Sequence, residues 1–381
     1  MMKSNILADK ITESYINKLI LPSDPAFPMW NRENFVFRKK PKWNYIDNCM
    51  IKAVIMLYEI TGNVKLFDYA VKFIDFYIGV DGSIPTMNIS DFNLDNVNGG
   101  KNLLYIFKKT GSEKYRQALE KINSQLKSQP RLENGNFCHK AVYPYQVWLD
   151  GIYMALPFMA EYAEFSGDLS VYDDIYSQLE NVHMIMRDEK TGLYFHGYDE
   201  THSQYWADSE TGLSSEIWLR SVGWFCAGLA DLCGIVRQNE RLYNLCSIML
   251  CELLDALSLC VNPDGTLCQL PLKPHISGNY TETSGTLLFA YSAVKSANLG
   301  ILGNDVLCAG LKAFNVVTEK YIIPDDIPVL KNICLVAGLG GNARRDGSES
   351  YYLGEKIVEN DAKGIAPYLM AYAEIKKRQS P

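Results

Sequence analysis

Apolar residues recur along most of the chain at intervals of three and four positions, with polar residues between them. The stretch 51–58, IKAVIMLY, is typical of this pattern. Such spacing predicts α-helices, because residues three and four positions apart share one face of a helix. Few segments alternate strictly between apolar and polar residues, so we expect only a few short strands, in rim loops. The sequence therefore predicts an all-α protein.

A weak internal repeat organises the predicted helices. Five units of similar pattern follow one another at intervals of 51, 54, 70 and 64 residues, and they begin at Trp43, Leu94, Trp148, Trp218 and Glu282. Each unit is predicted to be a helix, a short turn and a second helix. In the first three units a glycine suits the left-handed conformation that ends a helix, and these glycines are Gly62, Gly111 and Gly167.

The two ends of the chain, 6–19 and 360–377, supply a sixth helix pair. Six helical hairpins can close into a ring, so we expect an (α/α)6 barrel that spans residues 1–381 as a single domain. The first helix of each unit is apolar, as an inner helix should be, and the second carries more charge on one face. In such a ring the starts of the inner helices meet at one mouth, where we expect the functional side chains.

Composition narrows the choice of partners. The 37 Lys and Arg against 44 Asp and Glu give a net charge of −7, which disfavours nucleic acid because phosphate binding needs clustered cations. No stretch reaches the roughly 18 apolar residues of a membrane span. Asp9 and Glu13 interrupt the region where a signal peptide has its apolar run. The ten cysteines include no C-x-x-C pair, which favours buried free thiols. We therefore expect a cytoplasmic protein.

The segment 137–154, FCHKAVYPYQVWLDGIYM, places polar and aromatic side chains directly before an apolar helix. Asp150 lies at the predicted helix start, where an aspartate commonly caps the helix. Trp148 and Tyr153 flank it, and we expect them to desolvate the carboxyl and raise its pKa above the reference value of about 3.9. A raised pKa suits a side chain that donates a proton.

Asp95 occupies the equivalent position one unit earlier, in the segment 93–101, NLDNVNGGK. Helix capping is again the alternative interpretation. If both carboxyls line the mouth, their mutual repulsion favours a proton on one of them. Paired carboxyls are typical of enzymes that act on glycosidic bonds.

Three further residues are candidates for a ligand site. His196 lies in the segment 192–199, GLYFHGYD, which is predicted to be a rim strand or loop, where a histidine is more often structural. Arg220 and Trp224 are four residues apart and share one face of a predicted helix. A guanidinium beside an indole is a suitable platform for a sugar that bears a carboxylate, and a buried structural stack is the alternative.

Several familiar site patterns are absent from the sequence. The five histidines show no H-E-x-x-H spacing, and there is no G-x-S-x-G motif. The glycine-rich segment 337–341, AGLGG, lacks the pattern of a phosphate-binding loop. These absences disfavour a zinc hydrolase, a serine hydrolase of that type and a nucleotide-binding enzyme.

The sequence resembles the unsaturated rhamnogalacturonyl hydrolases, glycoside hydrolase family 105. The blocks that carry the resemblance include LDNVNGGK, YPYQVWLDGIYM, GLYFHGYDE, EIWLRSVGW and RDGSESYYLGEKIVENDAKG. The resemblance implies an (α/α)6 barrel. It also implies hydration of the C4=C5 double bond of an unsaturated uronic acid, at the non-reducing end of oligosaccharides from pectic rhamnogalacturonan. It implies a small oligosaccharide as partner, with no metal, no organic cofactor, no nucleic acid and no membrane.

Carried onto this chain, the resemblance implies that Asp150 protonates C4 and then, as a carboxylate, helps water to add at C5. Asp95 would match the second carboxylate of the family, which holds hydroxyls and tunes Asp150. The residues implied to line the subsite are His139, Lys140, Trp148, His196, Arg220 and Trp224. The local cations Lys140 and Arg220 would hold the substrate carboxylate against the overall negative charge.

Three alternatives stay open at this point. The sister glucuronyl hydrolases use the same hydration on other uronyl disaccharides. A sugar isomerase or epimerase on the same kind of barrel would depend on histidine acid–base residues at the mouth. A sugar-binding barrel without catalytic activity would tolerate the loss of the Asp150 carboxyl.

Overall fold

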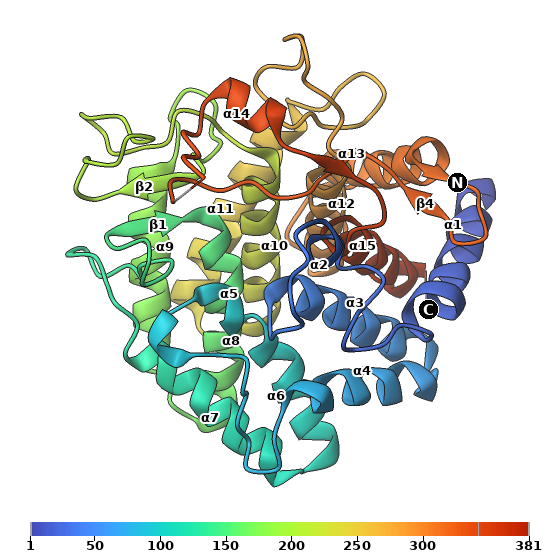
Figure 1. Cartoon of the computed structure of the whole chain (residues 1–381). Helices are drawn as coiled ribbons and strands as arrows, with labels where there is room; N and C mark the ends of the chain where they lie inside the picture. The colour runs from blue at the N-terminus through green and yellow to red at the C-terminus, as the bar shows by residue number, and fades with distance from the viewer. Residues whose placement is uncertain (1, 342, 380–381) are drawn as a thin grey trace.

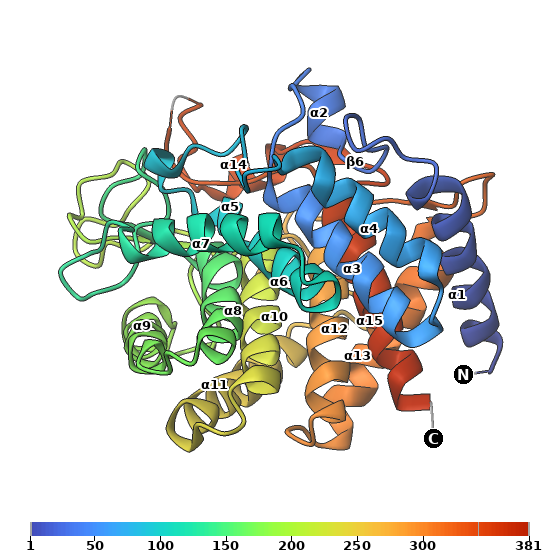
Figure 2. The same cartoon turned by 90° about the horizontal axis from the view of Figure 1, so that it is seen from below.

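The computed structural model describes residues 2–341 and 343–379. Within this part of the chain six inner helices stand side by side in a ring (Figures 1 and 2). They are α3 (Tyr45–Thr61), α6 (Gly99–Thr110), α8 (Leu149–Ser166), α10 (Leu219–Ile235), α12 (Thr283–Asn298) and α15 (Ala362–Gln379). Each packs against the next in chain order, and α15 packs against α3, which closes the ring.

An outer layer of helices covers this ring. The outer helices are α1 (Met2–Ser14), α4 (Val64–Tyr77), α7 (Glu113–Lys127), α9 (Val171–Met186), α11 (Glu240–Ser258) and α13 (Asn304–Val316). The pair made from the two chain ends is held by Asp9 of α1, whose carboxylate accepts a hydrogen bond from Tyr372 of α15 at 2.8 Å. The predicted all-α (α/α)6 barrel is therefore confirmed, including its closure by the termini.

The turns within the first three hairpins have the predicted geometry. Gly62, Gly111 and Gly167 follow α3, α6 and α8 with φ of 66°, 65° and 77°. In this left-handed conformation the N–H of Gly62 donates to the carbonyl of Tyr58 and completes the helix end. Glycine is favoured here because it has no Cβ to strain the backbone.

The inner helices are buried nearly all round, because each has neighbours on several sides. Close packing requires small residues at some contacts. A Cβ on Gly99 would lie 2.1 Å from Cζ2 of Trp43, and one on Gly100 would lie 2.6 Å from the ring of Phe158. The paired glycines at the start of α6 therefore let this helix approach its neighbours in the ring.

Short elements fill the rim at the end where the inner helices begin. The helical ones are η1 (Tyr15–Ile20), α2 (Arg32–Val36), η2 (Ile89–Asp91), α5 (Leu94–Val97), η3 (Val317–Tyr321) and α14 (Glu349–Gly354). The strands form three antiparallel pairs: β1 (Gln146–Trp148) with β2 (Gly197–Asp199), β3 (Ile322–Ile323) with β4 (Val329–Leu330), and β5 (Ile333–Cys334) with β6 (Ile357–Val358). The expectation of few, short strands is confirmed.

The β1–β2 pair matters most for the site. It pairs Trp148, the residue before α8, with Gly197, the residue after His196. His196 is thereby brought beside the start of α8. The described cysteines are all unpaired, as expected, although Cys308 is exposed and not buried. Among the described helices, none has the length and apolar character needed to cross a membrane.

Candidate active site

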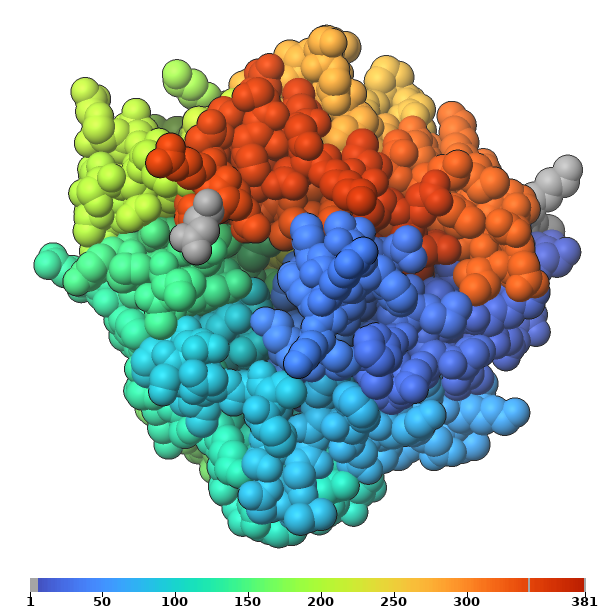
Figure 3. Space-filling view, in the orientation of Figure 1, coloured from blue at the N-terminus to red at the C-terminus, as the bar shows by residue number. Residues whose placement is uncertain are grey.

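A cavity of about 280 Å³ opens at the end of the barrel where the inner helices begin. Figure 3 shows it as a hollow between the blue N-terminal, green central and red C-terminal segments. Its lining includes Glu33, Phe37, Lys39, Lys42, Tyr45, Asp95, His139, Lys140, Tyr143, Trp148, Asp150 and Arg345. The helices α3, α5 and α8 all place their first turns on this cavity, as the repeat predicts.

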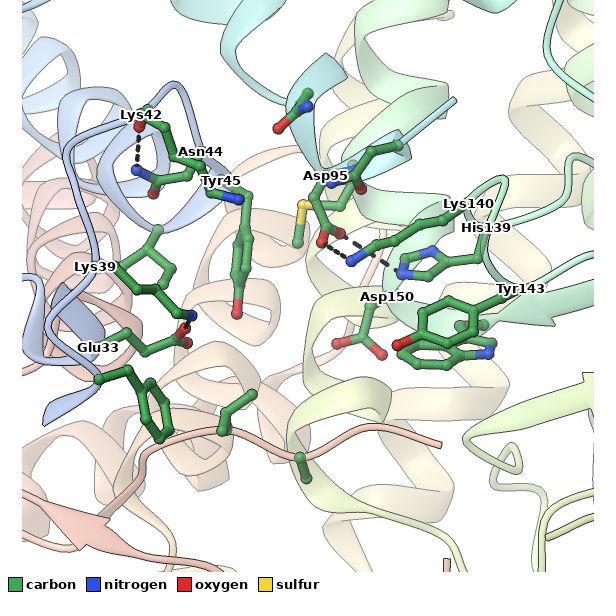
Figure 4. A pocket seen from close by; sticks show the side chains of 18 of the residues that line it. Glu33, Lys39, Lys42, Asn44, Tyr45, Asp95, His139, Lys140, Tyr143 and Asp150 are labelled. Carbon is green, nitrogen blue, oxygen red and sulfur yellow. Dashed lines mark hydrogen bonds and ion pairs between the residues drawn. The ribbon is translucent and has the colours of Figure 1, made fainter. Parts of the chain in front are cut away.

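Asp150 lies in the first turn of α8 and its carboxyl faces the cavity (Figure 4). Its side chain is 16% exposed, and its Oδ2 lies 3.3 Å from Nε2 of His196. Since Oδ2 is itself buried, a ligand in the cavity meets the other part of the carboxyl. The residue that precedes α8 is Trp148, and no side chain caps this helix end. The capping interpretation of Asp150 is therefore wrong.

The electrostatics of Asp150 differ from the prediction. Burial, the largest influence, raises its pKa as expected. The hydrogen-bonding and charge of His196, together with the charges of His139 and Arg220, outweigh burial and lower the pKa of Asp150 below its usual value. The prediction of a raised pKa is thus wrong for the free protein, because it left out the histidine that β2 brings behind the carboxyl.

Asp95 lies in α5, and its side chain is 13% exposed. Its Oδ2 accepts a hydrogen bond from Nζ of Lys140 at 2.6 Å, and its Oδ1 lies 3.7 Å from Nε2 of His139 (Figure 4). Asn93, not Asp95, caps this helix. Burial lowers the pKa of His139 to about 4, although the charge of Asp95 opposes this, so the ring is neutral near pH 7. The pair that carries charge here is therefore Asp95 with Lys140.

Three aromatic rings form a stack along one wall of the cavity. Trp148 lies between His139 and Tyr143, with both ring centroids 4.6 Å from its own. Trp148 is only 6% exposed, because its two faces are covered. Tyr143 is the least buried of the three rings and lines the cavity, and it was not among the predicted site residues. The glycine-rich segment packs against this wall, where a Cβ on Gly341 would lie 3.3 Å from the hydroxyl of Tyr143.

His196 lies behind Asp150 and does not line the cavity. It is fully buried, and its Nδ1 lies 2.6 Å from the hydroxyl of Tyr352 in α14. Its carbonyl accepts a hydrogen bond from the N–H of Leu149 at 3.0 Å, which ties it to the start of α8. His196 therefore both supports the start of α8 and contacts the carboxyl of Asp150.

Arg220 and Trp224 are each 1% exposed, and neither lines the cavity. The guanidinium of Arg220 lies over Trp218, 4.7 Å from the ring centroid, and donates to the carbonyl of Cys334. Trp224 stacks instead on Tyr153, with centroids 4.7 Å apart. The expected platform of Arg220 beside Trp224 is therefore not formed. Both residues are buried and structural, and each contacts a different aromatic ring: Trp218 for Arg220 and Tyr153 for Trp224.

Sequence reasoning also missed the opposite wall of the cavity. There Glu33 joins Lys39 at 2.7 Å and the fully buried Lys363 at 3.1 Å, so it ties the α2 segment to the first turn of α15. Tyr45 points into the cavity from the start of α3 (Figure 4). Tyr45 lies two residues after Trp43, at the start of the first repeat unit. This position in the repeat is the sequence signal that could have identified it as a site residue. No local pattern marks the contact of Glu33 with Lys363, because the two residues are 330 positions apart in the sequence.

Charge in the cavity is divided between acids and cations. Lys39 and Lys140 are paired with carboxylates, whereas Lys42 and Arg345 make no ion pair within the described part of the chain. No group of three or more His, Cys, Asp or Glu residues among the described residues is arranged to hold a metal ion. The cavity thus offers acidic groups, unpaired cations and an aromatic wall.

Comparisons with known proteins agree with this geometry. The model of Glycosyl Hydrolase Family 88 matches residues 26–379. The solved structure of a family 105 glycoside hydrolase from C. acetobutylicum ATCC 824 superposes with a TM-score of 0.89 and 33% identity, over 97% of this chain and 99% of the other.

Two curated proteins match over part of the chain. Protein Atu3128 of Agrobacterium fabrum is 36% identical over 58% of this chain and 97% of its own length. The unsaturated rhamnogalacturonyl hydrolase YesR of Bacillus subtilis is 22% identical over 68% of this chain and 72% of its own length.

Proposed function

The chain belongs to glycoside hydrolase family 88/105, the unsaturated uronyl hydrolases, and from this premise we propose that its substrates are rhamnogalacturonan-derived oligosaccharides. The proposed reaction releases the unsaturated 4-deoxy uronic acid from the non-reducing end by hydrating its C4=C5 double bond. The observation that carries the proposal is the pair of carboxyls in one cavity, Asp150 against His196 and Asp95 against Lys140. The name of the Bacillus subtilis relative supports the choice of substrate.

The cavity is suited to a sugar that bears a carboxylate. The helices α3, α5 and α8 all direct their N-termini, which carry partial positive charge, toward it. Lys42 and Arg345 add cations that no carboxylate of the described residues neutralises. These local charges act against the net charge of −7 of the chain. Tyr143 is half-buried and lines the cavity, so a sugar ring can pack against it.

In the proposed reaction Asp150, in its protonated form, gives its proton to C4. The electrons of the double bond form the new C–H bond, and positive charge develops at C5 and the ring oxygen. The carboxylate of Asp150 stabilises that charge and then accepts a proton from the water whose oxygen bonds to C5. The hemiketal that results opens, and the hemiacetal left at C1 releases the neighbouring sugar. Asp150 ends the hydration step protonated, so atoms and charge balance.

Asp95 and Lys140 have a binding role in this proposal. Their contact at 2.6 Å holds both groups at the cavity wall beside Asp150. A carboxylate accepts hydrogen bonds from sugar hydroxyls, and an ammonium donates to the substrate carboxylate. Trp148 is assigned to the support of this wall, since its faces are covered by His139 and Tyr143.

The test follows the ultraviolet absorbance of the unsaturated uronate. Wild type should remove the absorbance of unsaturated rhamnogalacturonyl disaccharides, with a higher kcat/KM than on unsaturated glucuronyl disaccharides. Asp150→Asn should lower kcat by about 10²–10⁴, the usual contribution of a positioned acid–base group. Asp91→Asn, an exposed acid on the rim, is the matched control and should keep the wild-type rate.

Two results would overturn the proposal. One is a wild-type protein that leaves the absorbance of both substrate classes unchanged. The other is an Asp150→Asn variant that keeps its activity while His196→Ala loses it, since that pattern would point to histidine-based isomerase chemistry.

A further inference from the structure

A buried chain of three side chains runs from α14 to the cavity. The hydroxyl of Tyr352 lies 2.6 Å from Nδ1 of His196, and Nε2 of His196 lies 3.3 Å from Oδ2 of Asp150. Tyr352 and His196 are both fully buried. Among the described residues, His196 is the only hydrogen-bond partner of the Tyr352 hydroxyl. These two neighbours therefore decide which ring nitrogen carries the proton in the neutral histidine.

The hydrogen-bonding capacity of Tyr352 selects one tautomer of His196. If Nδ1 carried the proton and donated it to the tyrosine, the hydroxyl proton would have no acceptor in a buried site. An unsatisfied buried donor costs about 1–3 kcal/mol. Nε2 would then also turn a lone pair toward the Asp150 carboxylate, which is unfavourable. If the hydroxyl donates to Nδ1, its proton has an acceptor, and Nε2 carries the proton that faces Asp150, 3.3 Å from Oδ2.

Tyr352 itself is held firmly in place. Its ring stacks on Trp218 with centroids 6.0 Å apart, and its carbonyl accepts a hydrogen bond from Gln269 at 3.1 Å. Gln269 in turn accepts a hydrogen bond from the indole N–H of Trp218 at 3.0 Å. Burial keeps the pKa of Tyr352 well above its usual range, so the hydroxyl retains its proton. The donor toward His196 is thus fixed in position and in protonation.

We propose that Tyr352 is a positioning residue, whose hydroxyl donates to Nδ1 of His196 and so holds the ring with its Nε2–H toward Asp150, 3.3 Å from Oδ2. This inference rests on the proposed role of Asp150 and deepens it. The donor steadies the buried oxygen of Asp150 while the carboxylate is charged. The other oxygen is then left free to accept the proton of the attacking water.

The first test is the ¹⁵N spectrum of the histidine rings in the ligand-free protein, in which five histidines give few signals. His196→Gln identifies the signals of His196. We expect a protonated Nε2 and an unprotonated Nδ1 in the wild type. In Tyr352→Phe, which keeps the ring and removes the donor, the hydrogen bond to Nδ1 is lost, so the ¹⁵N signal of the unprotonated Nδ1 should shift. Tyr351→Phe, the neighbouring tyrosine, is the control and should leave the Nδ1 signal of His196 unchanged.

The second test separates kcat from KM. Tyr352→Phe should lower kcat on the order of tenfold, a typical effect for a residue that orients a functional histidine, with KM changed less than about twofold. A wild-type His196 protonated on Nδ1 would overturn the proposal. So would a Tyr352→Phe variant, folded by circular dichroism, whose Nδ1 signal of His196 and kcat are those of wild type.

These outcomes can be told apart from failure of the proposed function. The spectrum needs no substrate. If it shows the expected tautomer in a protein that leaves every unsaturated uronate intact, the positioning by Tyr352 is supported and the proposed reaction is refuted.

Discussion

Glu33 offers a quantitative test of the wall that joins the α2 segment to the barrel. Its side chain is 9% exposed, and it contacts Lys39 at 2.7 Å and Lys363 at 3.1 Å. Burial alone would raise the pKa of Glu33, but the charges of Lys363 and Lys39 and their hydrogen bonds outweigh it. The pKa falls from 4.5 to about 2. We predict that Glu33→Gln destabilises the protein in a pH-dependent way.

The magnitude follows from the difference between the folded and unfolded pKa. Because the folded value is the lower one, Glu33 stabilises the protein fully above pH 4.5, and this contribution is lost as the pH falls through about 2. A shift from 4.5 to about 2 corresponds to about 3 kcal/mol near pH 7. The same linkage leaves about 1 kcal/mol at about pH 3, where the unfolded chain is already protonated.

The assay is urea unfolding of wild type and Glu33→Gln at a series of pH values between about 7 and 3. The difference in the free energy of unfolding should be about 3 kcal/mol at the upper end and should shrink toward the lower end. Glu189→Gln, on an exposed loop, is the control and should stay within about 0.5 kcal/mol of wild type. A difference that is constant with pH, or below 1 kcal/mol throughout, would refute the reasoning.

Three further predictions concern packing and the site. Gly99→Ala should lower the free energy of unfolding by about 1–3 kcal/mol or more, because its Cβ would lie 2.1 Å from Trp43. Gly62→Ala has free space around its Cβ and is strained only by its φ, so it should lower the free energy of unfolding by about 1 kcal/mol. Urea unfolding measures both. Asp95→Asn and Lys140→Met should show effects on kcat/KM that are less than additive in the double variant, with a coupling of about 1–3 kcal/mol, since the two groups lie 2.6 Å apart. Tyr143→Ala should raise KM more than it lowers kcat, because it removes the least buried ring of the aromatic wall, and the exposed Tyr205→Ala should change neither in the same steady-state assay.

The ring was predictable from the sequence because it follows from local signals. Apolar spacing gives helices, a glycine ends each of the first three inner helices, and the repeat places inner helices at regular intervals. Since parallel inner helices begin at one end, Asp95 and Asp150 had to approach one cavity, and the structure places them on it. These conclusions need no knowledge of how individual side chains pack.

The departures arise where packing between distant segments decides. The spacing of Arg220 and Trp224 places both on one helix face, but it cannot show that Trp218 and Tyr153 occupy that space. The covered faces of Trp148 depend on Tyr143 and His139, which come from a loop. Glu33 and Lys363 are 330 residues apart, so no local pattern connects them.

The low pKa of Asp150 in the free protein and its proposed work as an acid are consistent once the substrate is considered. In the free protein His196, His139 and Arg220 outweigh burial and lower the pKa of Asp150, which keeps the carboxyl ionised. A uronate brings a second negative charge close to Asp150 and displaces water from it. Both changes raise the pKa of a carboxyl, by like-charge repulsion and by desolvation. His139, with a pKa of about 4, stays neutral and does not compete for the proton. In the proposed reaction, binding of the anionic substrate therefore drives the protonation that the first step requires, and departure of the product restores the ionised carboxyl.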